Sequence, residues 1–211
     1  MSVVEAPALY SAQDFRRRAL IEREPPEADF YGDHQLNPDF RDLVVRPGLR
    51  AAAVMIAAVD YPDGASLILT KRTDRLRNHA GQIAFPGGRI DPEDSSPEAA
   101  ALRETEEEIG LDRSRIEVLG RLPDYSTGSG FRIAPVLGII KPGFQLSINP
   151  DEVDAAFEVP LAFLMDPANH ARGSRMWEKH ERFFYEMPYG DHYIWGVTAG
   201  VIRTLYERLY A

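Results

Sequence analysis

The stretch GGRIDPEDSSPEAAALRETEEEIGL, residues 87–111, places four glutamates within five positions and reaches a glycine two residues later. Ser96 and Pro97 are favourable N-cap and first-turn residues, and Gly110 is favourable just after a helix C-terminus. The pattern therefore predicts a helix over residues 97–109. Like charges three or four residues apart destabilise an isolated helix by roughly 0.2–0.5 kcal/mol per pair, so these glutamates need a compensating partner.

The glutamates can be sorted by their angle around this helix, at about 100° per residue. Glu104, Glu107 and Glu108 share one face, whereas Glu106 points the other way. Arg103 lies one turn before Glu107 and can pair with it. Three carboxylates on one face suit a hard divalent cation such as Mg²⁺, which prefers oxygen ligands. A solvated acidic face is the alternative, but the preceding small-residue run AAAL and the loop FPGG favour a metal site.

Composition limits the classes of protein to consider. A chain of 211 residues with 44% hydrophobic and 27% charged residues is typical of one soluble domain. A net charge of −9 argues against a nucleic-acid partner, and the absence of cysteine excludes disulfides, thiolate metal sites and a thiol nucleophile. The N-terminus lacks the pattern of a signal peptide, and the longest apolar run is too short to span a bilayer. We therefore expect a cytoplasmic monomer or homodimer without a membrane partner.

The rest of the chain alternates predicted strands and helices with short links. A serine-capped helical pattern covers residues 11–23, and residues 49–72 have the pattern of two buried strands joined by a Pro-Asp-Gly turn. Further predicted elements are strands at 115–122 and 131–140, a short helix at 160–166, a hairpin within 182–195 and a helix at 198–210. We predict one α/β or α+β domain over residues 45–211, preceded by a helical N-terminal extension over residues 1–44.

The glutamate-rich stretch resembles the Nudix box, in which a glycine and a spaced acid precede Arg-Glu-hydrophobic-x-Glu-Glu-x-Gly-hydrophobic. The matching residues are Arg103, Glu104, Glu107, Glu108, Gly110 and Leu111. Thr105 occupies the first hydrophobic position. Asp94 stands where the family usually has Glu, with one extra residue before Arg103, and this departure leaves a structural role for Asp94 open.

The resemblance implies an α/β/α sandwich around a mixed β-sheet, and metal-dependent hydrolysis of a nucleoside diphosphate linked to another group. Glu104, Glu107 and Glu108 would bind Mg²⁺ or Mn²⁺, with the Gly88 carbonyl as an extra ligand. The chemistry agrees, because a charged pyrophosphate needs cations to neutralise it and to lower the pKa of the attacking water. Such a cation would also offset the repulsion among the glutamates.

The upstream segment LILTKRTDRLRNHAGQIAFPGG, residues 67–88, resembles an additional motif of the coenzyme A branch of Nudix enzymes. The matching residues are Leu69, Thr70, Arg72, Arg77, Gly81, Phe85, Pro86, Gly87 and Gly88. Ile68 and Thr73 depart from the motif. Three later stretches, STGSGFRIAPVLGII, NPDEVDAAFEVPL and YIWGVTAGVIR, also resemble this branch. The small-molecule substrate implied is coenzyme A or its thioester, cleaved to 3′,5′-ADP and 4′-phosphopantetheine or its acyl form.

The segment also contains a basic island in an acidic protein, formed by Lys71, Arg72, Arg75 and Arg77. Guanidinium groups bind phosphate oxygens bidentately, which suits the 3′-phosphate and pyrophosphate of coenzyme A. A solvated turn is the alternative for any one arginine. Arg72 and Arg77 are favoured because they occupy motif positions. His79 could contact phosphate or cap the loop, and Gln82 could bond ligand or local backbone.

The general base is predicted from the remaining acids. Glu107 is possible, but a tight metal ligand makes a poor base. Asp151 and Glu152 lie in the loop NPDEVD, and Glu152 is favoured over the alternative of a simple helix-start acid. The predicted catalytic set is Arg103, Glu104, Glu107, Glu108 and Glu152, and the predicted substrate-binding set is Arg72, Arg77, His79 and Gln82. Trp195 and Tyr125 could stack on adenine, although packing in the interior is favoured for both.

Two other functions remain open at this point. A different Nudix pyrophosphatase would act on ADP-ribose, NADH or a dinucleoside polyphosphate, and would not need Arg72 and Arg77 for specificity. A catalytically silent Nudix domain used as a ligand sensor would have lost acids from the box. Glu104, Glu107 and Glu108 are all present, which disfavours the sensor.

Overall fold

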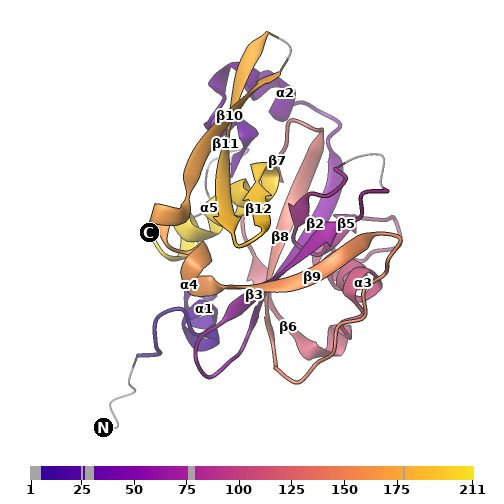
Figure 1. Cartoon of the computed structure of the whole chain (residues 1–211), viewed down its shortest axis with the longest axis vertical. Coiled ribbons are helices and arrows are strands. Elements are labelled where there is room, and N and C mark those ends of the chain that lie inside the picture. Colours follow the sequence, from indigo (N-terminus) through magenta and orange to yellow (C-terminus); the bar gives the residue numbers. More distant parts are fainter. Residues whose placement is uncertain (1–5, 25, 27–30, 76–78, 178) are drawn as a thin grey trace.

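The computed structural model describes residues 6–24, 26, 31–75, 79–177 and 179–211 (Figure 1). Strands of the described chain form two sheets. In the larger, mixed sheet the strand order is β1-β7-β8-β2-β3-β4, while β5 pairs with β2, β6 with β8 and β9 with β3. Its strands are β1 Tyr31–Gly32, β2 Arg50–Val59, β3 Ser66–Arg72, β4 Ile83–Ala84, β5 Gly87–Arg89, β6 Ile116–Arg121, β7 Tyr125–Ser126, β8 Phe131–Ile140 and β9 Val153–Pro160.

The second sheet is antiparallel and has the strand order β10-β11-β12. Its strands are β10 Ala171–Trp177, β11 His180–Tyr189 and β12 His192–Trp195. The α-helices are α1 Ala12–Ala19, α2 Arg41–Val44, α3 Pro97–Ile109, α4 Leu161–Leu164 and α5 Gly196–Leu209. Short 3₁₀ turns occupy Asp33–Gln35, Pro38–Phe40, Arg113–Arg115 and Pro167–Asn169. In the described part of the chain, no helix is long and apolar enough to cross a membrane.

Strands β2 and β8 form the centre of the main sheet and run parallel, in register from Arg50 opposite Phe131 to Val59 opposite Ile140. Successive side chains of β2 point to opposite faces, so Ile56 and Ala58 enter one hydrophobic cluster while Met55 and Ala57 enter the other. Both faces of the strand are therefore buried, which explains its nearly continuous apolar sequence.

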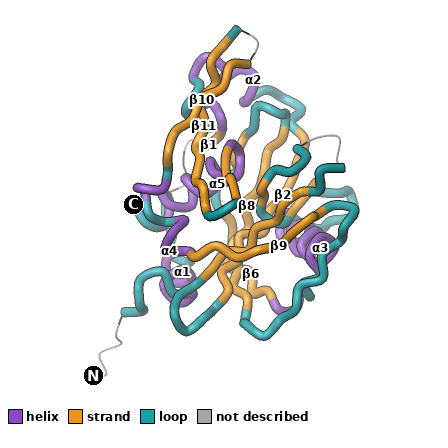
Figure 2. Tube along the Cα trace, viewed as in Figure 1, coloured by secondary structure: helices purple, strands orange, loops and turns teal. Residues whose placement is uncertain are grey.

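Helices cover both faces of this sheet (Figures 1 and 2). Phe15 of α1 and Leu205 of α5 belong to the cluster on one face, and Ala100 and Ile109 of α3 belong to the cluster on the other. This arrangement confirms the predicted α/β/α sandwich around a mixed sheet. The small residues Ala100 and Ala101 are fully buried and let α3 lie close against β2 and β5.

The ends of α3 form as the sequence predicts. Ser96 caps the helix, because its hydroxyl oxygen accepts a hydrogen bond from the backbone N–H of Ala99 at 3.2 Å. Gly110 ends it in the left-handed conformation with φ of 65°, which favours glycine. The glutamate-bearing face of α3 is thus fixed relative to the sheet at both ends of the helix.

Several elements differ from the sequence-based expectations. Helix α1 ends at Ala19, four residues earlier than predicted, and the segment between the predicted strands at 49–72 and α3 contains the short strands β4 and β5. Strands β9 and β10 were not predicted. Strand β10, ARGSRMW, is exposed along almost its whole length, so it lacks the alternation of apolar and polar residues by which a half-buried strand is recognised. The predicted hairpin is confirmed, with Tyr189 opposite His192.

The N-terminal residues pack against the rest of the chain. Phe15 of α1 is fully buried in the same cluster as α5, and the backbone N–H of Ala65 donates to the Tyr10 carbonyl at 2.9 Å. Strand β1 pairs in parallel with β7. The division of the chain into an extension over residues 1–44 and a domain over 45–211 stays a prediction.

Candidate metal centre and active site

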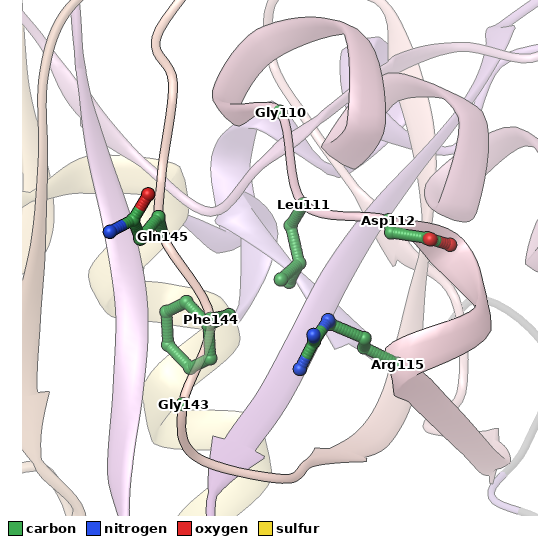
Figure 3. Close-up of a pocket in the computed structure, with 7 residues that line it drawn as sticks. All are labelled: Gly110, Leu111, Asp112, Arg115, Gly143, Phe144 and Gln145. Carbon is green, nitrogen blue, oxygen red and sulfur yellow. The ribbon is translucent and has the colours of Figure 1, made fainter.

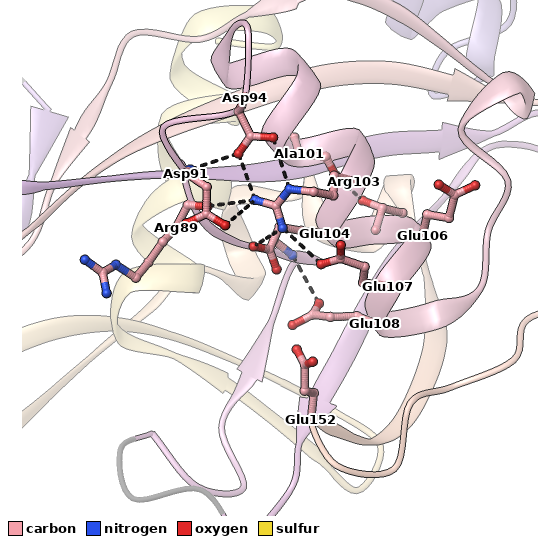
Figure 4. A network of polar contacts seen from close by, with 12 residues as sticks. Arg89, Asp91, Asp94, Ala101, Arg103, Glu104, Glu106, Glu107, Glu108 and Glu152 are labelled. Carbon is pink, nitrogen blue, oxygen red and sulfur yellow. Dashed lines mark hydrogen bonds and ion pairs between the residues drawn. The ribbon is translucent and has the colours of Figure 1, made fainter.

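Three glutamates meet where α3 faces the turn before β9 (Figure 4). Glu104 and Glu108 lie one turn apart on α3, and Glu152 immediately precedes β9. One carboxylate oxygen from each of the three lies within 4.8 Å of the others. Three oxygen donors at this separation provide the hard, anionic ligands that Mg²⁺ and Mn²⁺ prefer.

Glu108 is the most buried member of this glutamate cluster, with 2% of its surface exposed. Its Oε2 accepts a hydrogen bond from the backbone N–H of Gly87 at 3.1 Å, and its Oε1 lies 3.6 Å from Nη1 of Arg72. Burial nevertheless dominates and raises the pKa of the Glu108 carboxyl to about 7. A cation at this position would favour the charged form of Glu108 and offset the cost of burying it.

Glu104 lies against the backbone of β5. A Cβ added at Gly88 would lie 2.5–2.6 Å from the Glu104 carboxylate, so only glycine allows this approach. A Cβ at Gly87 would lie 2.3 Å from the Ala53 carbonyl oxygen. The two glycines therefore bring the β5 backbone directly beside the cluster. Burial also raises the pKa of Glu104, although the hydrogen bond from Arg103 opposes this shift.

Arg103 ties the site to the turn before α3. Its Nε and Nη2 donate to the two carboxylate oxygens of Asp94 at 3.0 and 2.8 Å. Its Nη1 donates to Glu104 and to Glu107, both at 2.9 Å, and Nη2 also reaches the Arg89 carbonyl at 3.1 Å. Asp94, whose role the sequence left open, is thus the bidentate partner of Arg103. Those hydrogen bonds are the main reason why the pKa of Asp94 is lowered.

Glu107 lies outside the cluster. Its side chain is 52% exposed and pairs with Arg103, as the helical spacing predicts. Glu106 points away from the cluster and accepts from Nε of Arg113 at 2.7 Å (Figure 4). The structure therefore brings together two of the three predicted metal-binding glutamates, together with Glu152, which the sequence suggested as the general base.

The described members of the predicted substrate-binding set lie at the end of β3 and in the segment between β3 and β4. Arg72, at the end of β3, faces Glu108, and its Nε is buried without a hydrogen-bond partner. The side chains of His79 and Gln82 contact each other, with 2.8 Å between Nδ1 and Oε1. Arg77 lies outside the described residues. The structure therefore places Arg72 beside the cluster, with its Nε not used by another described residue.

Of the two aromatic candidates, Tyr125 is buried and Trp195 is half-buried. Tyr125 is 4% exposed, and its hydroxyl donates to Asp33 at 3.1 Å. Trp195 lies in the second sheet against Phe184, with the ring centroids 5.1 Å apart. For Tyr125 the structure agrees with the favoured reading of a packing residue.

A cavity of about 390 Å³ lies beyond the C-terminal end of α3 (Figure 3). It is lined by Gly110, Leu111, Asp112, Arg115, Gly143, Phe144 and Gln145. None of the clustered glutamates lines it. Pyrophosphate hydrolysis needs cation ligands and a phosphate-binding group, and the glutamate cluster supplies both, through its carboxylates and the neighbouring Arg72. The residues that line the cavity do not include such a group of carboxylates. We therefore assign the active site to the glutamate cluster.

Sequence reasoning missed one residue at the site. Asn149 donates from Nδ2 to Oε1 of Glu152 at 3.1 Å, and its backbone N–H donates to the Glu108 carbonyl at 2.9 Å. The asparagine three residues before the favoured acid was visible in NPDEVD. Its contact with α3 could not be predicted, because it depends on how the preceding loop crosses the helix end.

Comparisons with known proteins identify the family. A family model described as the NUDIX domain matches residues 49–182. The chain is 41% identical over 162 residues to "Uncharacterized Nudix hydrolase NudL" of Photorhabdus laumondii, covering 76% of this chain and 85% of that protein. It is 42% identical over 164 residues to the Escherichia coli K12 protein of the same name, covering 74% and 81%.

Among solved structures, the chain is similar to a MutT/nudix family protein from Enterococcus faecalis, with 16% identity and a TM-score of 0.48, over 77% of this chain and 62% of that one. The family assignment rests on the NUDIX match and the two bacterial relatives. The matched residues 49–182 contain Glu104, Glu108 and Glu152. The chain therefore belongs to the Nudix family of hydrolases, enzymes that act on phosphoric anhydride bonds and use divalent cations.

Proposed function

We propose that this Nudix hydrolase cleaves the pyrophosphate of coenzyme A, or of a coenzyme A thioester. Water would add to phosphorus, the P–O bond of the pyrophosphate bridge would break, and the products would be 3′,5′-ADP and 4′-phosphopantetheine or its acyl form. The observation that carries this proposal is the position of Arg72 beside the glutamate cluster. Arg72 belongs to the segment that resembles the coenzyme A branch, lies 3.6 Å from Glu108, and keeps a buried Nε without a protein partner.

The unpaired Nε supports a phosphate ligand for a simple reason. A buried N–H group without an acceptor is unfavourable, and a phosphate oxygen would satisfy it. A guanidinium can present two parallel donors to a phosphate, which gives direction as well as charge. Arg72 would thus hold the pyrophosphate beside the carboxylates. Arg77, His79 and Gln82, which follow Arg72 in the sequence, are proposed as further substrate contacts.

Glu104, Glu108 and Glu152 are the proposed ligands of Mg²⁺ or Mn²⁺, with the Gly88 carbonyl and Glu107 as further ligand candidates. The fit is supported by the donor set and by the space that a side chain at Gly88 would fill. A bound cation would neutralise the pyrophosphate charge and lower the pKa of the attacking water. Arg103 would hold Glu104 and Glu107 in place through its bonds to both.

Glu152 is the proposed general base. It comes from a turn and not from α3, and its Oε1 already accepts a hydrogen bond from Asn149. A carboxylate oriented in this way can accept a proton from water held at the cluster. Glu152 would therefore contact the cation through that water, less tightly than the two glutamates of α3, and would receive the proton released when the water attacks.

A side-by-side hydrolysis assay tests the substrate. Coenzyme A, dephospho-coenzyme A, ADP-ribose and NADH are incubated with the enzyme and Mg²⁺ or Mn²⁺, and products are resolved by mass. We expect release of 3′,5′-ADP from coenzyme A to dominate. Preference for ADP-ribose or NADH would retain the metal centre and overturn the substrate proposal, and no turnover on any of the four would favour a ligand-sensing role.

A further inference from the structure

The loop between β8 and β9, residues 141–152, is attached to the C-terminal end of α3. The backbone N–H groups of Ser147 and Asn149 donate to the carbonyls of Ile109 and Glu108, both at 2.9 Å. These carbonyls belong to the last turn of the helix, where no later helical N–H is present to bind them. The loop therefore satisfies the end of the helix that carries Glu104 and Glu108.

Asn149 connects this attachment to Glu152. The Asn149 carbonyl accepts from the backbone N–H groups of Glu152 and Val153 at 3.1 and 2.9 Å. Its Oδ1 accepts from the backbone N–H of Asp151 at 3.2 Å, and its Nδ2 donates to Oε1 of Glu152 at 3.1 Å. Asn149 thus connects the backbone of Glu108 to the carboxylate of Glu152.

We propose that Asn149 is a positioning residue, which directs the Glu152 carboxylate toward Glu104 and Glu108 and so completes the cation site. The inference rests on the metal-binding role assigned to the cluster above. Without a cation the three carboxylates repel one another, and Glu152 is half-buried, so its side chain has room to turn toward solvent. The Asn149 amide opposes that rotation by donating to Oε1.

The chemistry of position 149 separates this role from a purely structural one. Any residue except proline could make the backbone bonds, and Asp could also supply the oxygen that accepts from the Asp151 N–H. Only a side chain with a donor can bond the ionised Glu152 carboxylate. Asn149→Asp therefore keeps the turn and removes the donor, and it places a second negative charge beside Glu152.

The experiment measures Mn²⁺ binding to the full chain by the loss of the free Mn²⁺ signal in electron paramagnetic resonance. The variants are Asn149→Ala, Asn149→Asp, Glu152→Ala and the double variant Asn149→Ala/Glu152→Ala. Asn169→Ala is the matched control, because the Asn169 side-chain amide also donates one hydrogen bond, to the Phe163 carbonyl at 2.9 Å, in a turn on another element. Thermal unfolding with EDTA confirms that each variant is folded.

We expect Asn149→Ala to weaken Mn²⁺ binding about 10-fold, as is typical for residues that orient a metal ligand. In the Glu152→Ala background the same substitution should change the Mn²⁺ Kd by less than about twofold, because the residue acts through Glu152. Asn149→Asp should also weaken Mn²⁺ binding. If the added negative charge alone mattered, this substitution would instead strengthen Mn²⁺ binding. On a substrate that is turned over, kcat should fall more than KM rises, and Asn169→Ala should match the wild type.

An unchanged Kd in Asn149→Ala, or an equal loss with and without Glu152, would overturn the positioning role. A wild-type chain that fails to bind Mn²⁺ would overturn both this role and the proposed metal centre. Binding of Mn²⁺ without hydrolysis of coenzyme A would remove only the proposed substrate, because the Mn²⁺ measurement does not depend on turnover.

Discussion

Glu108 shows how one residue can be costly for the fold and useful for the chemistry. Its carboxyl is 2% exposed, and burial raises its pKa to about 7, yet among the described residues its partners are a backbone N–H and a guanidinium at 3.6 Å. A buried carboxylate of this kind destabilises the metal-free protein. It also gives a cation a desolvated, strongly attracting ligand, which is the arrangement expected at a site built to bind one.

Glu108→Gln tests this role. The substitution removes the ligand charge, so we expect kcat with Mg²⁺ to fall by about 100-fold or more while the fold is retained. In EDTA at pH 8 the variant should melt at a higher temperature than the wild type, because a buried charge has been removed. Glu106→Gln, on the opposite face of α3, is the control and should leave kcat near the wild-type value. A Glu108→Gln enzyme with near-normal turnover would contradict the ligand assignment.

Arg77 is the subject of a second residue-level prediction, which comes from the sequence because the residue lies outside the described part of the structure. If Arg77 binds the 3′-phosphate, Arg77→Ala should raise KM for coenzyme A about 10-fold and change KM for dephospho-coenzyme A much less. Steady-state kinetics on the two substrates measure the difference. Arg75→Ala serves as the control from the same basic island, and equal effects on both substrates would place Arg77 elsewhere.

At the scale of elements, the site depends on how closely β5 approaches α3. Gly87 and Gly88 bring the β5 backbone against Glu104 and Glu108, and small alanines on α3 let the helix lie close to the sheet. The turn between the two elements is fixed by the bidentate pair of Asp94 and Arg103. The glycines, the alanines and this ion pair therefore act together to fix the distance between strand and helix.

Gly88→Ala tests this approach. The added methyl group would lie 2.5 Å from the Glu104 carboxylate, so the side chain or the strand must move. We expect Mn²⁺ binding to weaken by about 10-fold or more, measured by titration calorimetry, while the far-ultraviolet circular dichroism spectrum keeps the wild-type shape. Ala84→Gly, in the neighbouring short strand β4, is the comparison variant. Wild-type Mn²⁺ affinity in Gly88→Ala would show that β5 does not need to approach Glu104 so closely.

At the scale of the whole molecule, the cluster links stability to pH and to cations. The pKa of Glu108 rises from 4.5 in the unfolded chain to about 7 in the fold, which corresponds to roughly 3.5 kcal/mol at about 1.4 kcal/mol per pKa unit. Between these pH values the folded chain binds more protons than the unfolded chain. The contribution of Glu108 to the free energy of unfolding is therefore most favourable below pH 4.5 and is lost as pH rises to 7.

Thermal unfolding across this range measures the linkage. Once the titration of Glu108 is isolated by comparison with Glu108→Gln, the metal-free wild type should lose stability relative to the variant from pH 5 to pH 8. Added Mg²⁺ or Mn²⁺ should raise the melting temperature of the wild type more at pH 8 than at pH 5, because cation binding at pH 5 must displace a proton. A pH-independent difference between the two proteins would mean that Glu108 is not buried as a free carboxyl.

The sequence by itself determined the central strands, α3 with both of its caps, the C-terminal hairpin and helix, and the Nudix family. These features depend on local signals: apolar runs, a Ser-Pro start, a left-handed glycine and the spacing of glutamates on one helical face. Such signals act within a few residues, so they can be read along the chain. Helical spacing also correctly predicted the Arg103–Glu107 pair.

Only the tertiary structure decided which carboxylates meet. Glu107 satisfies the helical angle but pairs with Arg103, while Glu152 reaches the cluster from 44 residues beyond Glu108 because β9 pairs with β3 and the preceding loop bonds to the end of α3. The roles of Asp94 and Asn149 were likewise decided by the tertiary structure, because they depend on contacts with other segments. Strand β10 could not be predicted because its side chains are exposed. Angles on one helix show which side chains can face the same way, but only the packing of separate elements brings their oxygens together.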